Sequence, residues 1–366
     1  MNYDVIIIGA GPGGYEVGVK AAKAGLQVLV VEARKLGGTC LNEGCIPTKC
    51  LCKNASLLQE LKETNAFGIE AGEVQFDLSK AIARKDGIVE QLASGIATLM
   101  KTPGITLVQG KAQFIDQHTI EVEGTQYSAH NIIIATGSVT KFLPIEGAHS
   151  DGVVTSTEML NLRDVPQRLC IIGGGVIGME FATLYHELGI PVTVIEAMPT
   201  ILPNLDQEVV QILLDKYRKA GMTILTNTKV EEIKTNGVTA NGEWIEADKI
   251  LVCVGRRANL QGLEALNDLE LNRGAIVIDD FCKTNLPNVY ACGDVTGKIM
   301  LAHVASRQAE VAIGRMLKQI PLQRIAYNAI PSVVYTNPEI ASVGLTEQQV
   351  RDFYTEMEGE SGLVKA

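Results

Sequence analysis

Short apolar runs, separated by glycine-rich turns and amphipathic stretches, make up much of this chain. The apolar runs lie at residues 5–8, 28–31, 132–134 and 169–172. Short runs of Val, Ile and Leu bounded by turns predict buried strands. Residues 77–101 and 208–220 instead carry apolar side chains at helical spacing, and they predict amphipathic helices. Strands that alternate with helices indicate an α/β fold with parallel sheets.

Two segments share one order of elements. Residues 3–32 and residues 169–196 each contain a strand, a Gly-rich turn, a helix, a second strand and an acidic residue. This order is typical of a β-α-β unit, in which a helix connects two parallel strands. The segments begin about 160 residues apart, which is the size of a typical domain. The sequence therefore predicts two Rossmann-like domains.

The first Gly-rich turn fits the pattern G-x-G-x-x-G at Gly9, Gly11 and Gly14. The first Gly makes a tight turn, the second lets a pyrophosphate approach the backbone, and the third lets helix and strand pack closely. Glu32 ends the next strand, where a carboxylate binds ribose hydroxyls. A Gly-rich turn alone is a weak signal, but the strand, the helix and the acid together predict a dinucleotide site.

The second turn repeats this pattern at Gly173, Gly175 and Gly178, with Glu196 as the acid. A carboxylate at this position binds the free 2′-hydroxyl of NAD and repels the 2′-phosphate of NADP. No cluster of arginines follows Glu196. The second site is therefore predicted to favour NAD(H).

Cys40 and Cys45 follow the first nucleotide unit directly and lie among glycines. The alternative to a redox role is a pair of ordinary thiols in a loop. A helix is expected to start near Cys45, and the N-terminus of a helix stabilises a thiolate. Lys49 then lies one turn further along the same face. This arrangement predicts a redox-active disulfide.

Composition narrows the functional class. The chain has 366 residues, is 46% hydrophobic and 20% charged, and has a formal net charge of −10. An acidic surface argues against nucleic acid or an anionic membrane as a partner. No apolar run is long enough to span a membrane, and no signal peptide precedes the first strand, so we expect a cytoplasmic protein, with a processed mitochondrial form as the alternative.

The other six cysteines show neither the spacing of a secreted disulfide framework nor that of a zinc site, and no metal is expected. Cys170, Cys253 and Cys292 are expected to pack as small apolar residues. Cys282 is expected at the surface or at the end of a strand. Cys50 and Cys52 are expected to continue the helix that begins near Cys45.

The segment at residues 37–49 resembles the active-site motif of the flavin-dependent pyridine nucleotide-disulfide oxidoreductases. Within that family, its amino-acid sequence is most similar to the dihydrolipoamide dehydrogenase branch. The resemblance covers residues 1–345. Its further matches are residues 9–14, 135–137, 173–178 with Glu180, 254–257, 291–294 and 300–303. The resemblance implies an FAD-binding domain (residues 1–150 and 280–330), an NAD-binding domain (151–279) and a remnant of an α+β interface domain (331–366).

The resemblance also implies roles for individual residues. Cys40 meets the substrate thiol, Cys45 faces the flavin, and Lys49 lies near the flavin and pairs with Glu180. The implied FAD contacts are Gly9, Gly11, Gly14, Glu32, Thr39, Lys49, Thr136, Gly137, Asp294, Leu301 and Ala302. The implied NAD contacts are Gly173, Gly175, Gly178, Glu196 and Gly255.

The implied reaction passes dithiol electrons through the Cys40–Cys45 disulfide and FAD to NAD⁺. A small dithiol or a lipoyl domain is the implied substrate, and the implied setting is a 2-oxoacid dehydrogenase complex. The alternatives are another disulfide or metal-ion reductase of the family and a non-catalytic flavoprotein remnant. Glu196 argues against an NADPH-dependent glutathione reductase.

The chain departs from the family pattern at its C-terminal part. The family's acid–base His lies in a His-Pro motif, whereas none of the five histidines here precedes a proline and none follows His303. We therefore expect weak dihydrolipoamide oxidation and an impaired family homodimer. Residues 353–365 are expected to form a strand from further into the interface domain, which favours an internal loss. A truncated form and a natural variant with altered substrate use stay open as alternatives.

Overall fold

The structure is a computed structural model that describes residues 2–319 and 324–361. The chain divides into two compact units, each assembled from three separate segments. Unit 1 comprises Met1–Cys50, Lys80–Lys141 and Arg256–Ile325, and unit 2 comprises Leu51–Ser79, Phe142–Gly255 and Ala326–Ala366. The chain leaves unit 1 after residues 50 and 141 and re-enters it at residues 80 and 256, and the expected domain bounds stay a prediction.

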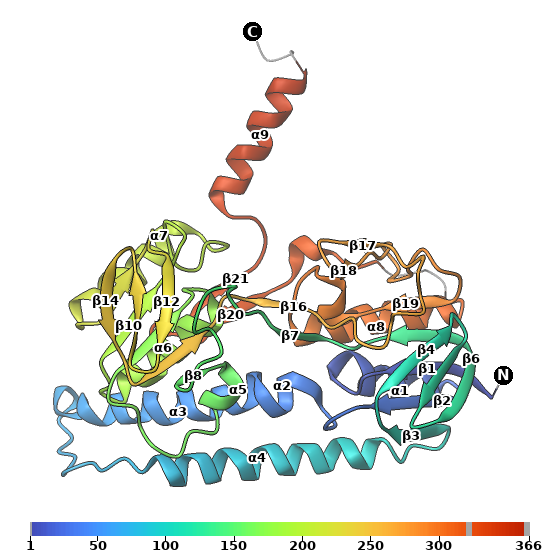
Figure 1. Cartoon of the computed structure of the whole chain (residues 1–366), viewed down its shortest axis with the longest axis horizontal. Coiled ribbons are helices and arrows are strands. Elements are labelled where there is room, and N and C mark those ends of the chain that lie inside the picture. The colour runs from blue at the N-terminus through green and yellow to red at the C-terminus, as the bar shows by residue number, and fades with distance from the viewer. Residues whose placement is uncertain (1, 320–323, 362–366) are drawn as a thin grey trace. The chain divides into compact units, whose positions relative to one another are not determined.

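Unit 1 is built on a seven-stranded sheet (Figure 1). Its strands are β1 (Tyr3–Ile8), β2 (Val28–Glu32), β3 (Ile105–Gln109), β4 (Ala112–Asp116), β5 (Thr119–Val122), β6 (Thr125–Ile134) and β19 (Val289–Ala291). The order is β3-β2-β1-β6-β5-β4, and β19 also pairs with β6. β1 runs parallel to β2 and β6, whereas β4, β5 and β6 form an antiparallel meander. β2 is buried along its whole length and β1 is buried from Val5 to Ile8, as expected of central parallel strands, whereas the edge strand β3 is partly exposed.

The helices of unit 1 follow from local sequence. α1 (Pro12–Lys23) begins with Pro, which suits the first helical position, and packs against α8 (Ala302–Met316). α2 (Gly38–Glu43) and α3 (Cys45–Lys62) come next in the chain, and α4 (Leu78–Leu99) is the long helix predicted at residues 77–101. The short strands are β7 (Ser138–Thr140), β16 (Arg256–Ala258), β17 (Leu271–Asn272) and β18 (Ala275–Ile276).

Unit 2 repeats the Rossmann-like arrangement, so the predicted α/β class is confirmed. Its parallel sheet has the order β11-β10-β9-β15-β8. These strands are β8 (Val153–Val154), β9 (Leu169–Ile172), β10 (Val192–Ile195), β11 (Thr223–Leu225) and β15 (Lys249–Val252). A separate antiparallel sheet holds β12 (Val230–Lys234), β13 (Gly237–Ala240) and β14 (Glu243–Glu246). The helices are α5 (Ser156–Met159), α6 (Val176–Glu187) and α7 (Gln207–Lys219).

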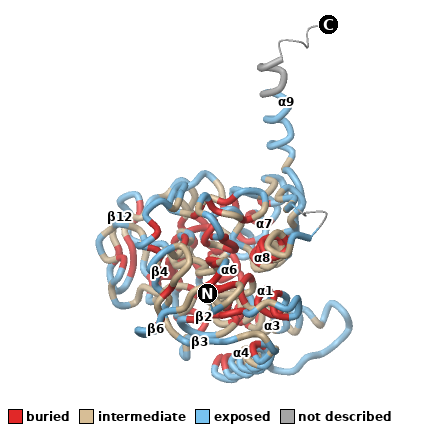
Figure 2. The backbone as a smooth tube through the Cα atoms, turned by 90° about the vertical axis from the view of Figure 1, so that its right-hand side faces the viewer, coloured by how far each residue is buried: buried red, intermediate tan, exposed pale blue. Residues whose placement is uncertain are grey.

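The last segment of unit 2 contains a hairpin and a helix. The hairpin consists of β20 (Ser332–Val334) and β21 (Ile340–Ser342), and the helix is α9 (Glu347–Ser361). The strand expected at residues 353–365 is therefore wrong as far as residue 361, and residues 362–365 lie outside the described part. Arg351 bonds Glu347, and Gln348 bonds Asp352, at the i, i+4 spacing that stabilises helices. Figure 2 colours α9 as exposed up to the point where the description of its burial ends.

The buried cysteines differ from expectation at one position. Cys170 and Cys292 are buried as expected, but Cys282 is also fully buried, so its expected surface position is wrong. Cys282 has φ 63° and lies in the turn before β19, where its backbone N–H bonds Asp279 and its carbonyl accepts from Ala291. The tight turn directs the side chain into the core.

The described residues contain neither a membrane-spanning helix nor a cluster of metal ligands. No helix there is long and apolar enough to cross a membrane. No group of three or more His, Cys, Asp or Glu side chains in the same residues could hold a metal ion.

Asn337 fixes the final segment of unit 2 by three hydrogen bonds. Its N–H donates to the Tyr217 hydroxyl (3.1 Å), its Nδ2 to Glu187 Oε1 (2.5 Å), and its Oδ1 accepts from Lys216 (2.9 Å). Burial raises the pKa of Glu187, and the Asn337 bond opposes that shift. Loss of this amide leaves a buried carboxylate without that donor.

We expect Asn337→Ala to lower the free energy of unfolding by about 2–3 kcal/mol, because hydrogen bonds to charged groups are the stronger ones. Urea denaturation measures the change. Gln211→Ala, which removes an exposed bond to Asp215 on α7, is the matched control and should change stability by less than about 0.5 kcal/mol. Equal effects of the two substitutions would contradict the assignment.

Candidate active site

The first Gly-rich turn connects β1 to α1 in the predicted way. Gly9 has φ 105°, and a Cβ on it would lie 2.3 Å from the Ala135 carbonyl oxygen, where the turn meets the end of β6. A Cβ on Gly14 would lie 1.8 Å from the Gly9 carbonyl oxygen, so only glycine lets α1 approach β1 this closely. The turn is thus packed closely against the backbone of β6 and α1 at its glycines.

Glu32 lies where the dinucleotide interpretation requires it. Its side chain is buried, Oε2 accepts the N–H of Ala10 (2.7 Å), and Oε1 accepts the N–H of Arg34 (2.7 Å). The acid is therefore fixed beside the Gly-rich turn. Gly11 is the N-cap of α1, and no side chain caps that helix end. A carboxylate for ribose and helix amides for phosphate fit an adenine dinucleotide.

Unit 2 contains the same geometry a second time. Glu196 Oε2 accepts the N–H of Gly174 (2.7 Å), and Oε1 accepts the N–H of Met198 (2.7 Å). A Cβ on Gly178 would lie 2.0 Å from the Gly173 carbonyl oxygen, which is the counterpart of the Gly14 contact in unit 1. The second turn is therefore also suited to a dinucleotide.

The thiols of Cys40 and Cys45 meet at the junction of α2 and α3. Cys40 lies in α2, Gly44 separates the helices, and Cys45 is the first residue of α3. The two side chains hydrogen-bond each other. The break between α2 and α3 thus brings two cysteines that are five positions apart into one dithiol. The N-terminal end of α3 favours negative charge on the Cys45 sulfur.

The Cys40 thiol holds its proton tightly. The hydrogen bond to Cys45 and partial burial raise the pKa of Cys40 far above that of a free thiol, and the nearby Lys49 ammonium lowers it only in part. At neutral pH Cys40 is therefore a neutral thiol in the reduced pair. Its deprotonation needs a base.

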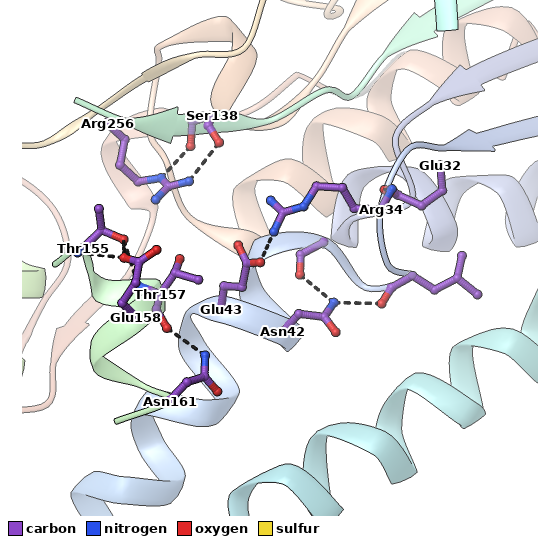
Figure 3. A network of polar contacts seen from close by, with 12 residues as sticks. Glu32, Arg34, Asn42, Glu43, Ser138, Thr155, Thr157, Glu158, Asn161 and Arg256 are labelled. Atoms are coloured by element: carbon purple, nitrogen blue, oxygen red, sulfur yellow. Dashed lines mark hydrogen bonds and ion pairs between the residues drawn. The ribbon is translucent and has the colours of Figure 1, made fainter. Parts of the chain in front are cut away.

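Asp294 lies in a short turn, η2 (Gly293–Thr296), and is oriented by Ser138 of β7. The Ser138 hydroxyl donates to Asp294 Oδ2 at 2.6 Å. Arg256 of β16 donates from Nε to that hydroxyl oxygen (2.7 Å) and from Nη2 to the Ser138 carbonyl (2.9 Å), as Figure 3 shows. Burial lowers the pKa of Arg256, and Asp294 and Glu43 oppose that shift.

Glu43 lies between the two cysteines in the sequence and is bound by an arginine. Arg34 donates to the Glu43 carboxylate, and its backbone N–H is the one that binds Glu32 (Figure 3). Asn42 adds hydrogen bonds to the carbonyls of Leu36 and Gly38. α2 is thereby attached to the end of β2, next to the first Gly-rich turn.

The predicted residues are distributed over both units. Unit 1 brings together Gly9, Gly11, Gly14 and Glu32, and it also brings Cys40, Cys45 and Lys49 together. Its other predicted residues are Thr39 in α2, Thr136 and Gly137 after β6, Asp294 in η2, and Leu301 with Ala302 at the start of α8. Unit 2 holds Gly173, Gly175, Gly178, Glu196 and Gly255.

Glu180 lies in unit 2 and Lys49 in unit 1, so their pairing stays a prediction. Glu180 is buried in α6, and its Oε1 accepts the N–H of Tyr335 at 3.1 Å. This carboxylate is thereby attached to the residue that directly follows β20 in the final segment of unit 2.

Sequence reasoning gave no role to Ser138, Arg256, Gln308 or Asn337. Ser138 directly follows the predicted site residues Thr136 and Gly137, and this position in the sequence could have indicated that it lies near the site. The bonds of Arg256 and Gln308 reach residues far away in the chain, and no local pattern indicates them.

Comparison with known proteins places this geometry in context. The family described as "Pyridine nucleotide-disulphide oxidoreductase" matches residues 3–309. The family described as "Pyridine nucleotide-disulphide oxidoreductase, dimerisation domain" matches residues 330–364.

Individual relatives match over most of the chain. A dihydrolipoyl dehydrogenase of Acholeplasma laidlawii is 43% identical over 326 residues, which cover 87% of this chain and 97% of that protein. A dihydrolipoyl dehydrogenase of Thermus scotoductus is 42% identical over 364 residues, covering 96% and 78%. Among solved structures, the HOCl-induced flavoprotein disulfide reductase RclA from Escherichia coli matches with a TM-score of 0.85 and 30% identity, covering 96% and 79%.

Proposed function

Because this chain belongs to the pyridine nucleotide-disulphide oxidoreductase family, it is an FAD-dependent disulfide oxidoreductase, and we propose that it oxidises a dihydrolipoyl dithiol and reduces NAD⁺. Its cofactors are FAD and NAD. The observation that carries the proposal is the Cys40–Cys45 pair in unit 1, which also contains a dinucleotide turn and its acid. The names of the similar dihydrolipoyl dehydrogenases support the substrate class.

Each unit contains the groups that one cofactor needs. In unit 1 the Gly9–Gly14 turn and Glu32 would hold the adenosine and phosphates of FAD, and Asp294 would bind its ribityl or phosphate part. In unit 2 the Gly173–Gly178 turn and Glu196 hold NAD. Glu196 has both carboxylate oxygens fixed by backbone amides, which favours NAD over its 2′-phosphorylated form.

The chemistry at sulfur is a thiol–disulfide exchange. A substrate thiolate attacks Cys40 Sγ of the oxidised pair, the Cys40–Cys45 bond breaks, and Cys45 leaves as a thiolate. The second substrate thiolate then attacks the mixed disulfide and expels Cys40, so that the substrate leaves as a disulfide and the pair gains two electrons. FAD, when bound, accepts this electron pair and passes it on to NAD⁺. The nearby Lys49 ammonium lowers the pKa of Cys40, so it would stabilise the Cys40 thiolate that the second step releases.

Removal of the proton from the substrate thiol needs a base. No histidine follows His303 in the 366 residues, so none of them matches the C-terminal His expected for this role. A positioned general base is worth about 10²–10⁴-fold in rate. We therefore propose that a polypeptide of these residues oxidises dihydrolipoamide slowly and relies on ionisation of the substrate thiol in solution. The match to the dimerisation domain suggests a homodimer, and we propose that this dimer serves a 2-oxoacid dehydrogenase complex.

The test compares substrates and pH with the FAD-loaded 366-residue chain. We expect NAD⁺ reduction by dihydrolipoamide to rise nearly tenfold per pH unit from about pH 6.5 to about pH 8, as the thiol ionises. NADH without oxygen should generate two new titratable thiols. A rate independent of pH would contradict the proposed dependence on ionisation of the substrate thiol. Faster reduction of glutathione disulfide would favour another disulfide reductase, and no turnover with no new thiols would indicate a non-catalytic flavoprotein.

A further inference from the structure

A fully buried glutamine on α8 holds the turn that carries Asp294. Gln308 has no exposed surface, and a buried amide is costly unless it is hydrogen-bonded. Its Oε1 accepts the N–H of Gly293 at 2.6 Å, and its Nε2 donates to Thr296 Oγ1 at 3.4 Å. The Thr296 hydroxyl in turn donates to the Gly293 carbonyl at 2.8 Å. The amide therefore contacts both ends of η2.

The backbone of this turn has a left-handed conformation and lies close to α8, so its buried N–H needs a hydrogen-bond acceptor on that helix. Gly293 has φ 77°, and a Cβ there would lie 3.2 Å from Ala305 Cβ of α8. The polypeptide thus passes very close to α8 just before Asp294. An acceptor on α8 for the Gly293 N–H keeps this close approach without an unpaired buried donor.

Asp294 is consequently held from two directions. Its carboxylate accepts the Ser138 hydroxyl, and its backbone lies between Gly293 and Thr296, which both contact Gln308. Gln308 is also part of the helix that begins at Leu301 and Ala302, two further predicted flavin contacts. One side chain thereby connects the Asp294 turn to the helix whose first turn is expected to face the flavin.

We propose that Gln308 is a positioning residue for the flavin site, and that it sets the register between Asp294 and α8. The proposal rests on the proposed function, because it takes Asp294 as a ligand of FAD. Its amide suits this position because it supplies one acceptor for Gly293 and one donor for Thr296. Gln308→Met keeps nearly the same volume and removes both bonds, whereas Gln308→Glu keeps an acceptor.

The experiment is a double-mutant cycle on FAD release from the full chain. Release is followed by the fluorescence of free FAD, and thermal unfolding is measured in parallel. We expect Gln308→Met and Asp294→Ala each to speed FAD release about tenfold to a hundredfold. The double variant should release FAD no faster than Asp294→Ala alone, because the positioning effect needs the carboxylate that it positions.

Matched variants separate positioning from general destabilisation. Ser306→Ala removes an α8 hydrogen bond to Ala302 that does not reach the turn, and it should leave FAD release unchanged. Thr296→Val removes one Gln308 contact and should act in the same direction as Gln308→Met, which keeps the test valid if Gln308→Met does not fold. Gln308→Glu should retain FAD better than Gln308→Met.

The outcomes distinguish the two levels of inference. Additive effects of Gln308→Met and Asp294→Ala would overturn the positioning role and leave the function intact. Normal FAD release from Asp294→Ala would overturn the assignment of Asp294 in the proposed function itself. Non-additive effects with an unchanged Ser306→Ala variant would support both.

Discussion

Replacement of either Cys40 or Cys45 by serine is expected to lower dihydrolipoamide-dependent NAD⁺ reduction about a thousandfold or more, because neither sulfur can form the disulfide alone. The two side chains share a hydrogen bond, which supports the proposal that they form one redox pair. A steady-state assay with the FAD-loaded chain measures the loss.

The control for this prediction lies in the helix that begins at Cys45. Cys50→Ser and Cys52→Ser replace cysteines of α3 that are not part of the pair, and both should keep nearly full activity. The Cys40 and Cys45 variants should also keep their FAD and the reduction of artificial dyes by NADH. Substantial dithiol oxidation by Cys45→Ser would rule out the exchange mechanism, because no disulfide between Cys40 and Cys45 could form.

Two glycines of the second turn are expected to lose NADH binding for different reasons when each is replaced by alanine. A Cβ on Gly175 meets no atom within 4 Å, and its φ of −75° suits any residue. Gly175→Ala should therefore fold normally, but its methyl group would stand where pyrophosphate approaches the backbone. We expect about hundredfold weaker NADH binding with unchanged thermal unfolding.

Gly178→Ala should instead damage unit 2 itself. Its Cβ would lie 2.0 Å from the Gly173 carbonyl oxygen, and the clash is with backbone that cannot turn away. We expect a loss of about 2–3 kcal/mol in the free energy of unfolding, and loss of NADH binding with it. Calorimetry measures both quantities. Native NADH affinity in Gly175→Ala would place the phosphate site elsewhere, and FAD retention serves as the internal control in unit 1.

Each of the two units contains its own dinucleotide turn. The two turns use the same backbone contacts, with Glu32 and Glu196 fixed by equivalent amides. A difference in their ligands therefore has to come from surrounding residues. In unit 1 those residues include Asp294 with Ser138, and in unit 2 Glu180 connects α6 to the final segment.

Local sequence determined the features that depend on backbone conformation and short spacing. The two Gly-rich turns require residues without a Cβ, so their glycines are visible in the sequence and lie where the pattern predicts. Helices such as residues 77–101 and 208–220 were predictable because apolar spacing records which face is buried. The Cys40–Cys45 motif, with the turns around it, was enough to predict the family.

Tertiary structure decided the features that depend on distant partners. In the sequence, Gln308 is indistinguishable from an ordinary polar residue of an amphipathic helix. Only the packing of α8 against η2 buries its side chain and makes it the hydrogen-bond acceptor of the Gly293 N–H. Cys282 lies in a turn, yet the turn directs it inward. The strand expected from residue 353 onward is wrong as far as residue 361, because these residues continue α9, whose first turns carry i, i+4 pairs that favour a helix. Local spacing determines which elements form, whereas the pairing of buried polar groups depends on which elements meet.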